Sequence, residues 1–226
     1  LDVHVMLALL DDLGVSVRDE GPNALALRAD RVRTTHLDPD LCRRLRASLL
    51  LAGPLLARCG EVELPLAGGD FIGRRRVDTH LLAFRGLGAD CVVERSYRLS
   101  HSGLRGAEIF LDEASVTATE NALMAAVLAD GETVIDNAAR EPEIADLAAM
   151  LNRMGGNIVG AGSPTIRVEG VLELLPVEHE VIPDRIEAAT FLAALGVAGG
   201  ELTLEGARPD HMDMLVAKLG QMGMRI

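Results

Sequence analysis

Thr119-Glu-Asn-Ala-Leu-Met-Ala-Ala-Val-Leu-Ala-Asp-Gly131, followed at once by Glu132-Thr-Val-Ile-Asp136, is the stretch of sequence that decides the fold. Apolar residues at helical spacing run up to a glycine, where a helix can end in a left-handed backbone, and a short alternating strand follows. The same pattern of helix, glycine and strand occurs at residues 45–65 and 184–205. It predicts an α/β chain built from repeated units.

A second kind of helix is interleaved with the first. It covers residues 3–14, 79–88, 144–155 and 212–223, and the closing glycines lie 74, 67 and 68 residues apart. A strand, a turn and a second strand follow it, as at residues 91–100 and 157–169. The predicted unit of about 70 residues is therefore helix–strand–loop–helix–strand–hairpin–strand, with a helical face buried on each small sheet.

Composition narrows the class of protein. A formal net charge of −12 disfavours nucleic acid and anionic membranes as partners, and an aromatic content of 2% disfavours base stacking. Cys42, Cys59 and Cys91 are isolated, which predicts neither a disulfide framework nor a zinc site. The sequence holds no apolar run of the roughly 18 residues that a membrane helix needs. We expect a cytoplasmic enzyme without metal or cofactor.

Residues 68–76, Gly-Gly-Asp-Phe-Ile-Gly-Arg-Arg-Arg, concentrate positive charge in an acidic chain. Gly68 and Gly69 allow the backbone to approach a ligand closely, and the three arginines predict a phosphate-bearing substrate. A solvated turn paired with nearby carboxylates is the alternative. Asp70 could donate a proton only if burial or a neighbouring negative ligand kept it protonated, and a plain turn residue is again the alternative.

Two other segments suit an anion. Arg46 begins the apolar helix predicted at residues 46–58, close to its positive end. Residues 115–121, Ser-Val-Thr-Ala-Thr-Glu-Asn, form a hydroxyl-rich entry to the next helix. That entry fits both structural capping and an anion site.

Together these segments resemble the UDP-N-acetylglucosamine 1-carboxyvinyltransferases, a family of enolpyruvyl transferases. The matching stretches are residues 46–48, 53–58, 68–78 with His80, 118–121, 137–146, 160–162, 165–170 and 182–187. The resemblance implies an inside-out α/β barrel, with helices packed inside small sheets, in two domains of three repeats each. Residues 1–182 would form most of the loop-bearing domain, without its N-terminal part, and residues 183–226 would begin a truncated second domain.

The activity that the resemblance implies is transfer of the enolpyruvyl group from phosphoenolpyruvate to the 3′-hydroxyl of UDP-N-acetylglucosamine, with release of phosphate. This is the first committed step of peptidoglycan synthesis, carried out by a monomer or weak homo-oligomer. Asp70 is at a position where the family usually has cysteine and some members have aspartate. It would be the proton donor near C3 of phosphoenolpyruvate, or would assist product release. The implied substrate-binding residues at the phosphate are Arg46 and Arg75, and those at the nucleotide-sugar are Val77, Asp78, Thr79, Ser115, Val116 and Thr117. Arg76 is also expected to bind substrate.

Some residues depart from the family pattern. Arg76 stands where the family normally has proline, Thr117 replaces a glycine, and Glu113 falls where some relatives have lysine. The Lys-Asn pair of the N-terminal segment and the aspartate of the second domain are absent, so this chain alone should not turn over. A diverged paralogue acting on another nucleotide or sugar, and a non-catalytic binding remnant, are the alternatives. The shikimate-pathway enolpyruvyl transferase shares the architecture, but the matching segments fit it poorly.

Overall fold

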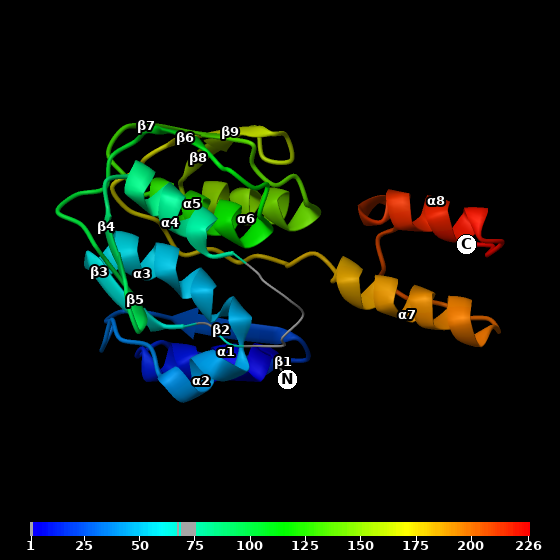
Figure 1. The fold of residues 1–226 in the computed structure, drawn as a ribbon. Coiled ribbons are helices and arrows are strands. Elements are labelled where there is room, and N and C mark those ends of the chain that lie inside the picture. Colours follow the sequence, from blue (N-terminus) through cyan, green and yellow to red (C-terminus); the bar gives the residue numbers. More distant parts are fainter. Residues whose placement is uncertain (1, 67, 69–75) are drawn as a thin grey trace.

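The computed structural model describes residues 2–66, 68 and 76–226, which form a mixed α/β chain (Figure 1). The helices are α1 (Asp2–Asp12), α2 (Pro39–Arg44), the 3₁₀ helix η1 (Arg46–Leu51), α3 (Ala52–Cys59), α4 (Asp78–Gly86), α5 (Val116–Ala126), α6 (Pro142–Arg153), α7 (Arg185–Ala198), the 3₁₀ helix η2 (Pro209–His211) and α8 (Asp213–Gln221). The strands are β1 (Ser16–Gly21), β2 (Ala24–Arg28), β3 (Glu61–Pro65), β4 (Asp90–Val93), β5 (Ser96–Ser100), β6 (Glu108–Phe110), β7 (Glu132–Asp136), β8 (Asn157–Val159) and β9 (Thr165–Glu169). None of the helices in the described part is both long and apolar enough to cross a membrane.

Three small sheets lie around the helices of the main body (Figure 1). Strands β1 and β2 form a hairpin, β3-β5-β4 form an antiparallel sheet, and β6-β7-β9-β8 form a mixed one. In the second sheet Val62 lies opposite Leu99, and in the third Ile135 lies opposite Ile166. These side chains are buried on the inner face while their neighbours along each strand are more exposed, as expected for sheets covered on one side.

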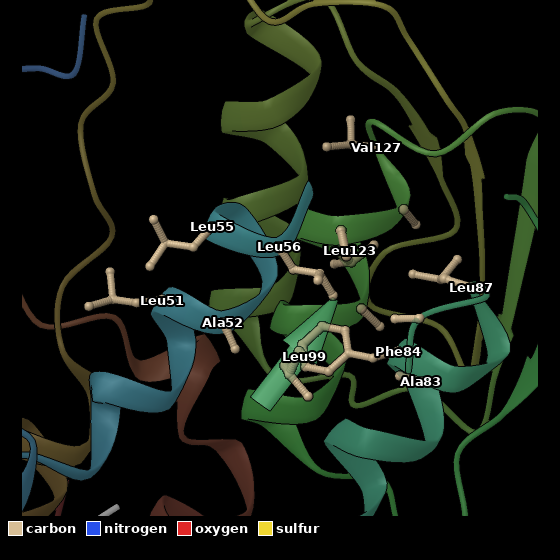
Figure 2. Packing of buried hydrophobic residues seen from close by; sticks show 14 of the residues in the cluster. Leu51, Ala52, Leu55, Leu56, Ala83, Phe84, Leu87, Leu99, Leu123 and Val127 are labelled. Carbon is tan, nitrogen blue, oxygen red and sulfur yellow. The ribbon is translucent and has the colours of Figure 1, made fainter. Parts of the chain in front are cut away.

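Helix α5 lies at the centre, in contact with α3, α4 and α6. Most of its side chains are small, and seven of its residues are buried, from Ala118 to Ala126. Small side chains let the neighbouring helices approach closely, and larger apolar groups fill the gaps. Figure 2 shows Leu56, Phe84 and Leu123 pointing into the space between α3, α4 and α5. Helices surrounded by sheets are the inside-out α/β arrangement that the sequence predicts.

The repeat is confirmed by backbone geometry. All four glycines that end the helices of the second kind have left-handed backbones: Gly14 (φ 95°), Gly88 (φ 90°), Gly155 (φ 101°) and Gly223 (φ 98°). Gly60 and Gly131, which end helices of the first kind, also have positive φ. The predicted hairpins at residues 91–100 and 157–169 are present as β4–β5 and β8–β9. A parallel bridge between His36 and Glu63 corresponds to the parallel β6–β7 pairing one repeat later.

Two details of the prediction are wrong. The helix expected at residues 45–60 is divided at Ala52 into η1 and α3, because Pro54 has no N–H and the Gly53 N–H bonds to Asn121 Oδ1 at 2.8 Å. The strand expected at residues 201–205 is absent, because no strand in the described chain lies beside it to share its backbone hydrogen bonds.

A second, smaller hydrophobic cluster lies on α7 and α8, which extend beyond the main body in Figure 1. Its buried members are Ala188, Leu192, Met212 and Leu219, whereas the main cluster draws its buried residues from positions 5–168. The boundary between residues 182 and 183 stays a prediction.

The junction of η1 and α3 gives a stability prediction. A Cβ added at Gly53 would lie 2.7 Å from the Asn121 carbonyl oxygen and 2.9 Å from its Oδ1, so α3 and α5 would have to separate. We expect Gly53→Ala to lower the free energy of unfolding by about 2 kcal/mol. Urea unfolding followed by circular dichroism measures it. Gly220→Ala in α8 is the matched control, because nothing lies within 4 Å of its added Cβ, and it should cost nothing.

Candidate functional site

The site begins where α4 and α5 start side by side. Val77 precedes α4, and Asp78 and Thr79 form its first turn. Ser115 caps α5, whose first residues are Val116 and Thr117. The structure therefore brings together two segments that the sequence assigns to one substrate pocket (residues 76–79 and 115–117), because α4 packs on α5.

Arg76 and Asp112 link these two segments at the exposed edge of the site, called the rim below, which residues 76–79 and 112–117 form. Arg76 Nη2 donates to Asp112 Oδ2 at 2.6 Å, and Arg76 Nε donates to Asp78 Oδ2 at 3.3 Å. The other oxygen of Asp112 accepts from the buried Thr79 hydroxyl at 2.7 Å. The hydrogen bonds from Thr79 and Arg76 hold the pKa of Asp112 below its usual range, while the bond to Asp112 raises the pKa of Arg76. Both groups are charged and hold the rim together.

Arg46 joins the site from the start of η1. Its Nη2 donates to the Arg76 carbonyl oxygen at 3.5 Å. Its positive charge adds to burial in lowering the pKa of His80. The structure therefore places the Arg46 side chain beside the Arg76 backbone, and the predicted role of Arg46 at a phosphate stays a prediction.

His80 and Asn121 form a buried polar cluster beneath the rim. Asn121 Nδ2 lies 2.9 Å from His80 Nδ1, and His80 Nε2 lies 3.2 Å from Thr117 Oγ1. His80 is 2% exposed, and burial, together with the charge of Arg46, lowers its pKa from 6.5 to about 4. The imidazole is therefore neutral at pH 7.

The entry to α5 uses its hydroxyl groups for capping. Ser115 Oγ accepts from the Ala118 N–H at 3.4 Å, and Thr119 Oγ1 donates to the Ser115 carbonyl at 2.8 Å. Thr119 Oγ1 also accepts from the Ala139 N–H at 3.0 Å. The capping interpretation is confirmed for Ser115, whereas Thr117 is an exposed residue whose hydroxyl lies 3.2 Å from His80 Nε2.

Asp70 and Arg75 lie outside the described residues, so their predicted roles stay predictions. Gly68 is among the described residues, and the backbone that it approaches closely is that of α2. Its N–H donates to the Cys42 carbonyl at 3.2 Å, and a Cβ there would lie 2.0 Å from the Arg43 carbonyl oxygen. Gly68 therefore allows a close approach to α2.

An open cavity of about 740 Å³ lies between the end of β3, the loop before α2 and the β4–β5 turn. Its polar lining includes His36, Glu63, Arg43 and Arg95, and Ser96 donates to Glu63 at 2.6 Å. None of the predicted substrate-binding residues in the described part lines it. Among the residues with described positions, no group of three or more His, Cys, Asp or Glu side chains could hold a metal ion.

An ion pair connects α6 with α7. Arg185 donates to both oxygens of Glu143, at 2.8 and 3.1 Å. Burial acts to raise the pKa of Glu143, but the hydrogen bond and charge of Arg185 outweigh it and leave the pKa lowered. Burial and the charge of Glu143 raise the pKa of nearby Glu120 to about 7. Residues 183–226 are thus tied to the main body by a paired charge.

Comparison with known proteins identifies the family. The family model for EPSP synthase (3-phosphoshikimate 1-carboxyvinyltransferase) matches residues 1–226. The chain belongs to the EPSP synthase family. Two similar curated relatives are named UDP-N-acetylglucosamine 1-carboxyvinyltransferase 1. The one from Symbiobacterium thermophilum is 51% identical over 100% of this chain and 52% of its own length, and the one from Caldanaerobacter subterraneus is 46% identical over 100% and 54%.

Solved structures of the EPSP synthase family share the fold. The enolpyruvyl transferase NikO from Streptomyces tendae superposes with a TM-score of 0.71 and 23% identity, over 84% of this chain and 46% of that one. EPSP synthase from Acinetobacter baumannii gives a TM-score of 0.66 and 22% identity, over 97% and 51%. The chain spans about half the length of the curated relatives that it matches.

The site contains three residues to which the sequence prediction gave no role: His80, Asp112 and Asn121. His80 and Asn121 belong to the stretches that carry the family resemblance, and each is the last polar residue before an apolar run of a predicted helix. Their position in the sequence is the signal by which these two residues could have been predicted as part of the site. Asp112 lies in a loop, and nothing in its sequence context indicates that it pairs with Arg76 across 36 positions.

The pKa of His80 predicts a pH dependence of stability. The unfolded chain takes up a proton near pH 6.5, whereas folded His80 resists it until about pH 4. This contribution to stability is therefore complete above pH 6.5 and is lost as the pH falls from 6.5 to 4, by roughly 3 kcal/mol. Glu120, whose pKa is raised to about 7, acts in the opposite direction over much of this range. The measurement is therefore the difference between the unaltered chain and His80→Gln in urea unfolding, because Glu120 is present in both. Their difference in stability should change by roughly 3 kcal/mol between pH 6.5 and 4, and a constant difference would contradict the assignment.

Proposed function

We propose that this chain serves the transfer of the enolpyruvyl group from phosphoenolpyruvate to the 3′-hydroxyl of UDP-N-acetylglucosamine, with release of phosphate. The observation that carries the proposal is identity of 44–51%, over 99–100% of this chain, with five curated relatives named as the enzyme of that reaction. Peptidoglycan synthesis is the process that this reaction supplies.

The proposed chemistry has an addition and an elimination. The sugar hydroxyl loses its proton to a base, which the family resemblance places in the second domain, as its oxygen bonds to C2 of phosphoenolpyruvate. C3 gains a proton, for which Asp70 is the proposed donor. Loss of a proton from C3 and departure of phosphate then restore the double bond. Arg46 and Arg75 are the proposed phosphate ligands, because a guanidinium offers paired, permanently charged donors.

The geometry of the rim supports a nucleotide-sugar pocket along residues 76–79 and 115–117. Asp112 holds Arg76 and Thr79 at hydrogen-bonding distance, so the first turns of α4 and α5 are joined before any ligand arrives. Preorganised contacts reduce the ordering cost of binding. Arg76 therefore has a positioning part in the pocket, with its donors engaged by Asp112 and Asp78.

The proposed setting is the cytoplasm, with the protein acting as a monomer or weak homo-oligomer. Its three cysteines are free thiols, in keeping with a reducing compartment, and burial raises the pKa of each. Phosphoenolpyruvate and UDP-N-acetylglucosamine are the proposed small-molecule partners. The shared name of the relatives favours this acceptor over another nucleotide or sugar.

The acceptor can be tested in a chimera in which this chain replaces the matching half of the Symbiobacterium relative. We expect phosphate release from phosphoenolpyruvate only when UDP-N-acetylglucosamine is present, because the hydroxyl must add before phosphate can leave. A colorimetric phosphate assay measures it, with the relative itself as the positive control. Phosphate release only with a different acceptor would overturn the assignment to cell-wall synthesis.

Asp70 gives a second test in the same chimera. Fosfomycin alkylates the loop cysteine of those relatives that carry one, and a carboxylate is a much poorer nucleophile than a thiolate toward its epoxide. We expect the chimera to keep full activity in fosfomycin, and Asp70→Cys to become sensitive. Time-dependent inactivation and intact-mass spectrometry measure the effect. A covalent fosfomycin adduct on the Asp70 chimera would contradict the prediction.

A further inference from the structure

The orientation of the Asn121 amide is fixed by two backbone groups. The Gly53 N–H can only donate, and it lies 2.8 Å from Asn121 Oδ1. The Leu49 carbonyl can only accept, and it lies 2.9 Å from Asn121 Nδ2. Exchanging the amide oxygen and nitrogen would break both bonds inside a fully buried site. Asn121 Nδ2 therefore has one remaining N–H, which points at His80 Nδ1 at 2.9 Å.

This N–H determines which nitrogen of His80 carries the proton. His80 Nδ1 must accept from Asn121, so the ring proton of the neutral imidazole lies on Nε2. His80 Nε2 is 3.2 Å from Thr117 Oγ1 and donates to it. Donated hydrogen bonds thus run from the Gly53 N–H of α3 through Asn121 and His80 to Thr117, while the other Asn121 N–H donates to the Leu49 carbonyl of η1.

Thr117 receives a hydrogen bond from inside and has its own proton left to donate. Thr117 is exposed, and the described residues offer its hydroxyl proton no acceptor. We propose that His80 is a positioning residue, held by Asn121 with its proton on Nε2, that makes the Thr117 hydroxyl a hydrogen-bond donor to an acceptor oxygen of the bound nucleotide. A glycine at position 117 could make neither bond, so the donor is a specificity element of chains with threonine there.

The ligand part of this inference rests on the proposed function, whereas the proton position on His80 does not. Thr117 lies at the first turn of α5, whose N-terminal end favours negative charge. Diphosphate oxygens and uracil carbonyls are the acceptors that a uridine nucleotide offers. Uridine and UDP therefore serve as separate probes of the two sources.

The proton position can be read directly by NMR of this chain labelled with ¹⁵N-histidine. We expect the Nε2 shift of His80 to be that of a protonated nitrogen and its Nδ1 shift that of a bare nitrogen. The signals are assigned by their loss in His80→Gln. A protonated Nδ1 would overturn the inference, whatever the chain binds.

The donor role of Thr117 is tested by titrating the labelled chain and its variants with UDP and with uridine, and following the NMR shift changes. We expect Thr117→Val to weaken UDP binding about tenfold, and Thr117→Ser to restore it, because serine keeps the hydroxyl. Thr190→Val on α7 is the matched control: Thr190 is exposed, bonds only to its own helix at Ile186, and should change nothing. An equal loss for uridine assigns the acceptor to uracil, and a loss for UDP alone assigns it to the diphosphate.

Two results would overturn the proposed donor role of Thr117. They also distinguish a failure of that role from a failure of the proposed function. If the unaltered chain binds UDP and Thr117→Val binds it equally well, the Thr117 donor is wrong while the nucleotide pocket stands. If the unaltered chain shows no shift changes with either probe, the proposed pocket and the ligand role of Thr117 both fail.

Discussion

A single buried amide, that of Asn121, constrains the centre of this molecule. An amide in an apolar interior costs free energy unless each of its polar atoms finds a partner. Asn121 satisfies both N–H groups and its oxygen with partners from Leu49, Gly53 and His80. These partners lie on η1, α3 and α4, so the hydrogen bonds of Asn121 fix the position and the rotation of each of these helices relative to α5. Placement of the site at the starts of α4 and α5 depends on that register.

The site combines two electrostatic environments with different consequences. At the rim, Arg76 and Asp112 form an exposed ion pair, which contributes little to stability in water but fixes two segments relative to each other. Beneath it, burial and the charge of Arg46 keep His80 neutral, and its hydrogen bonds are strengthened by the low local dielectric. The charged side chains are therefore at the surface, where an anionic substrate would meet them. The buried side chains are neutral, and their hydrogen bonds have a fixed donor-to-acceptor direction.

The sequence allowed the repeat, the hairpins and the inside-out class to be predicted, because glycine ends and alternating strands are local signals. Gly14, Gly88 and Gly155 each take the left-handed backbone that their positions require. The division of η1 from α3 has a local cause in Pro54, but it also depends on the bond from Gly53 to Asn121, which is distant in sequence and was missed. The site segments were found through family resemblance, but the bonds among Asp112, His80 and Thr117 depend on packing between helices, which no local pattern reports.

The contact between Gly53 and Asn121 joins positions 68 residues apart, close to one repeat length. Copies of a duplicated unit begin with identical surfaces, yet here one copy supplies a glycine gap and its neighbour supplies the amide that enters it. The units have become complementary, so they can no longer be exchanged, reordered or changed one at a time at these positions. An ancestral symmetry thus remains in the backbone, whereas the side chains have made each unit specific to its place.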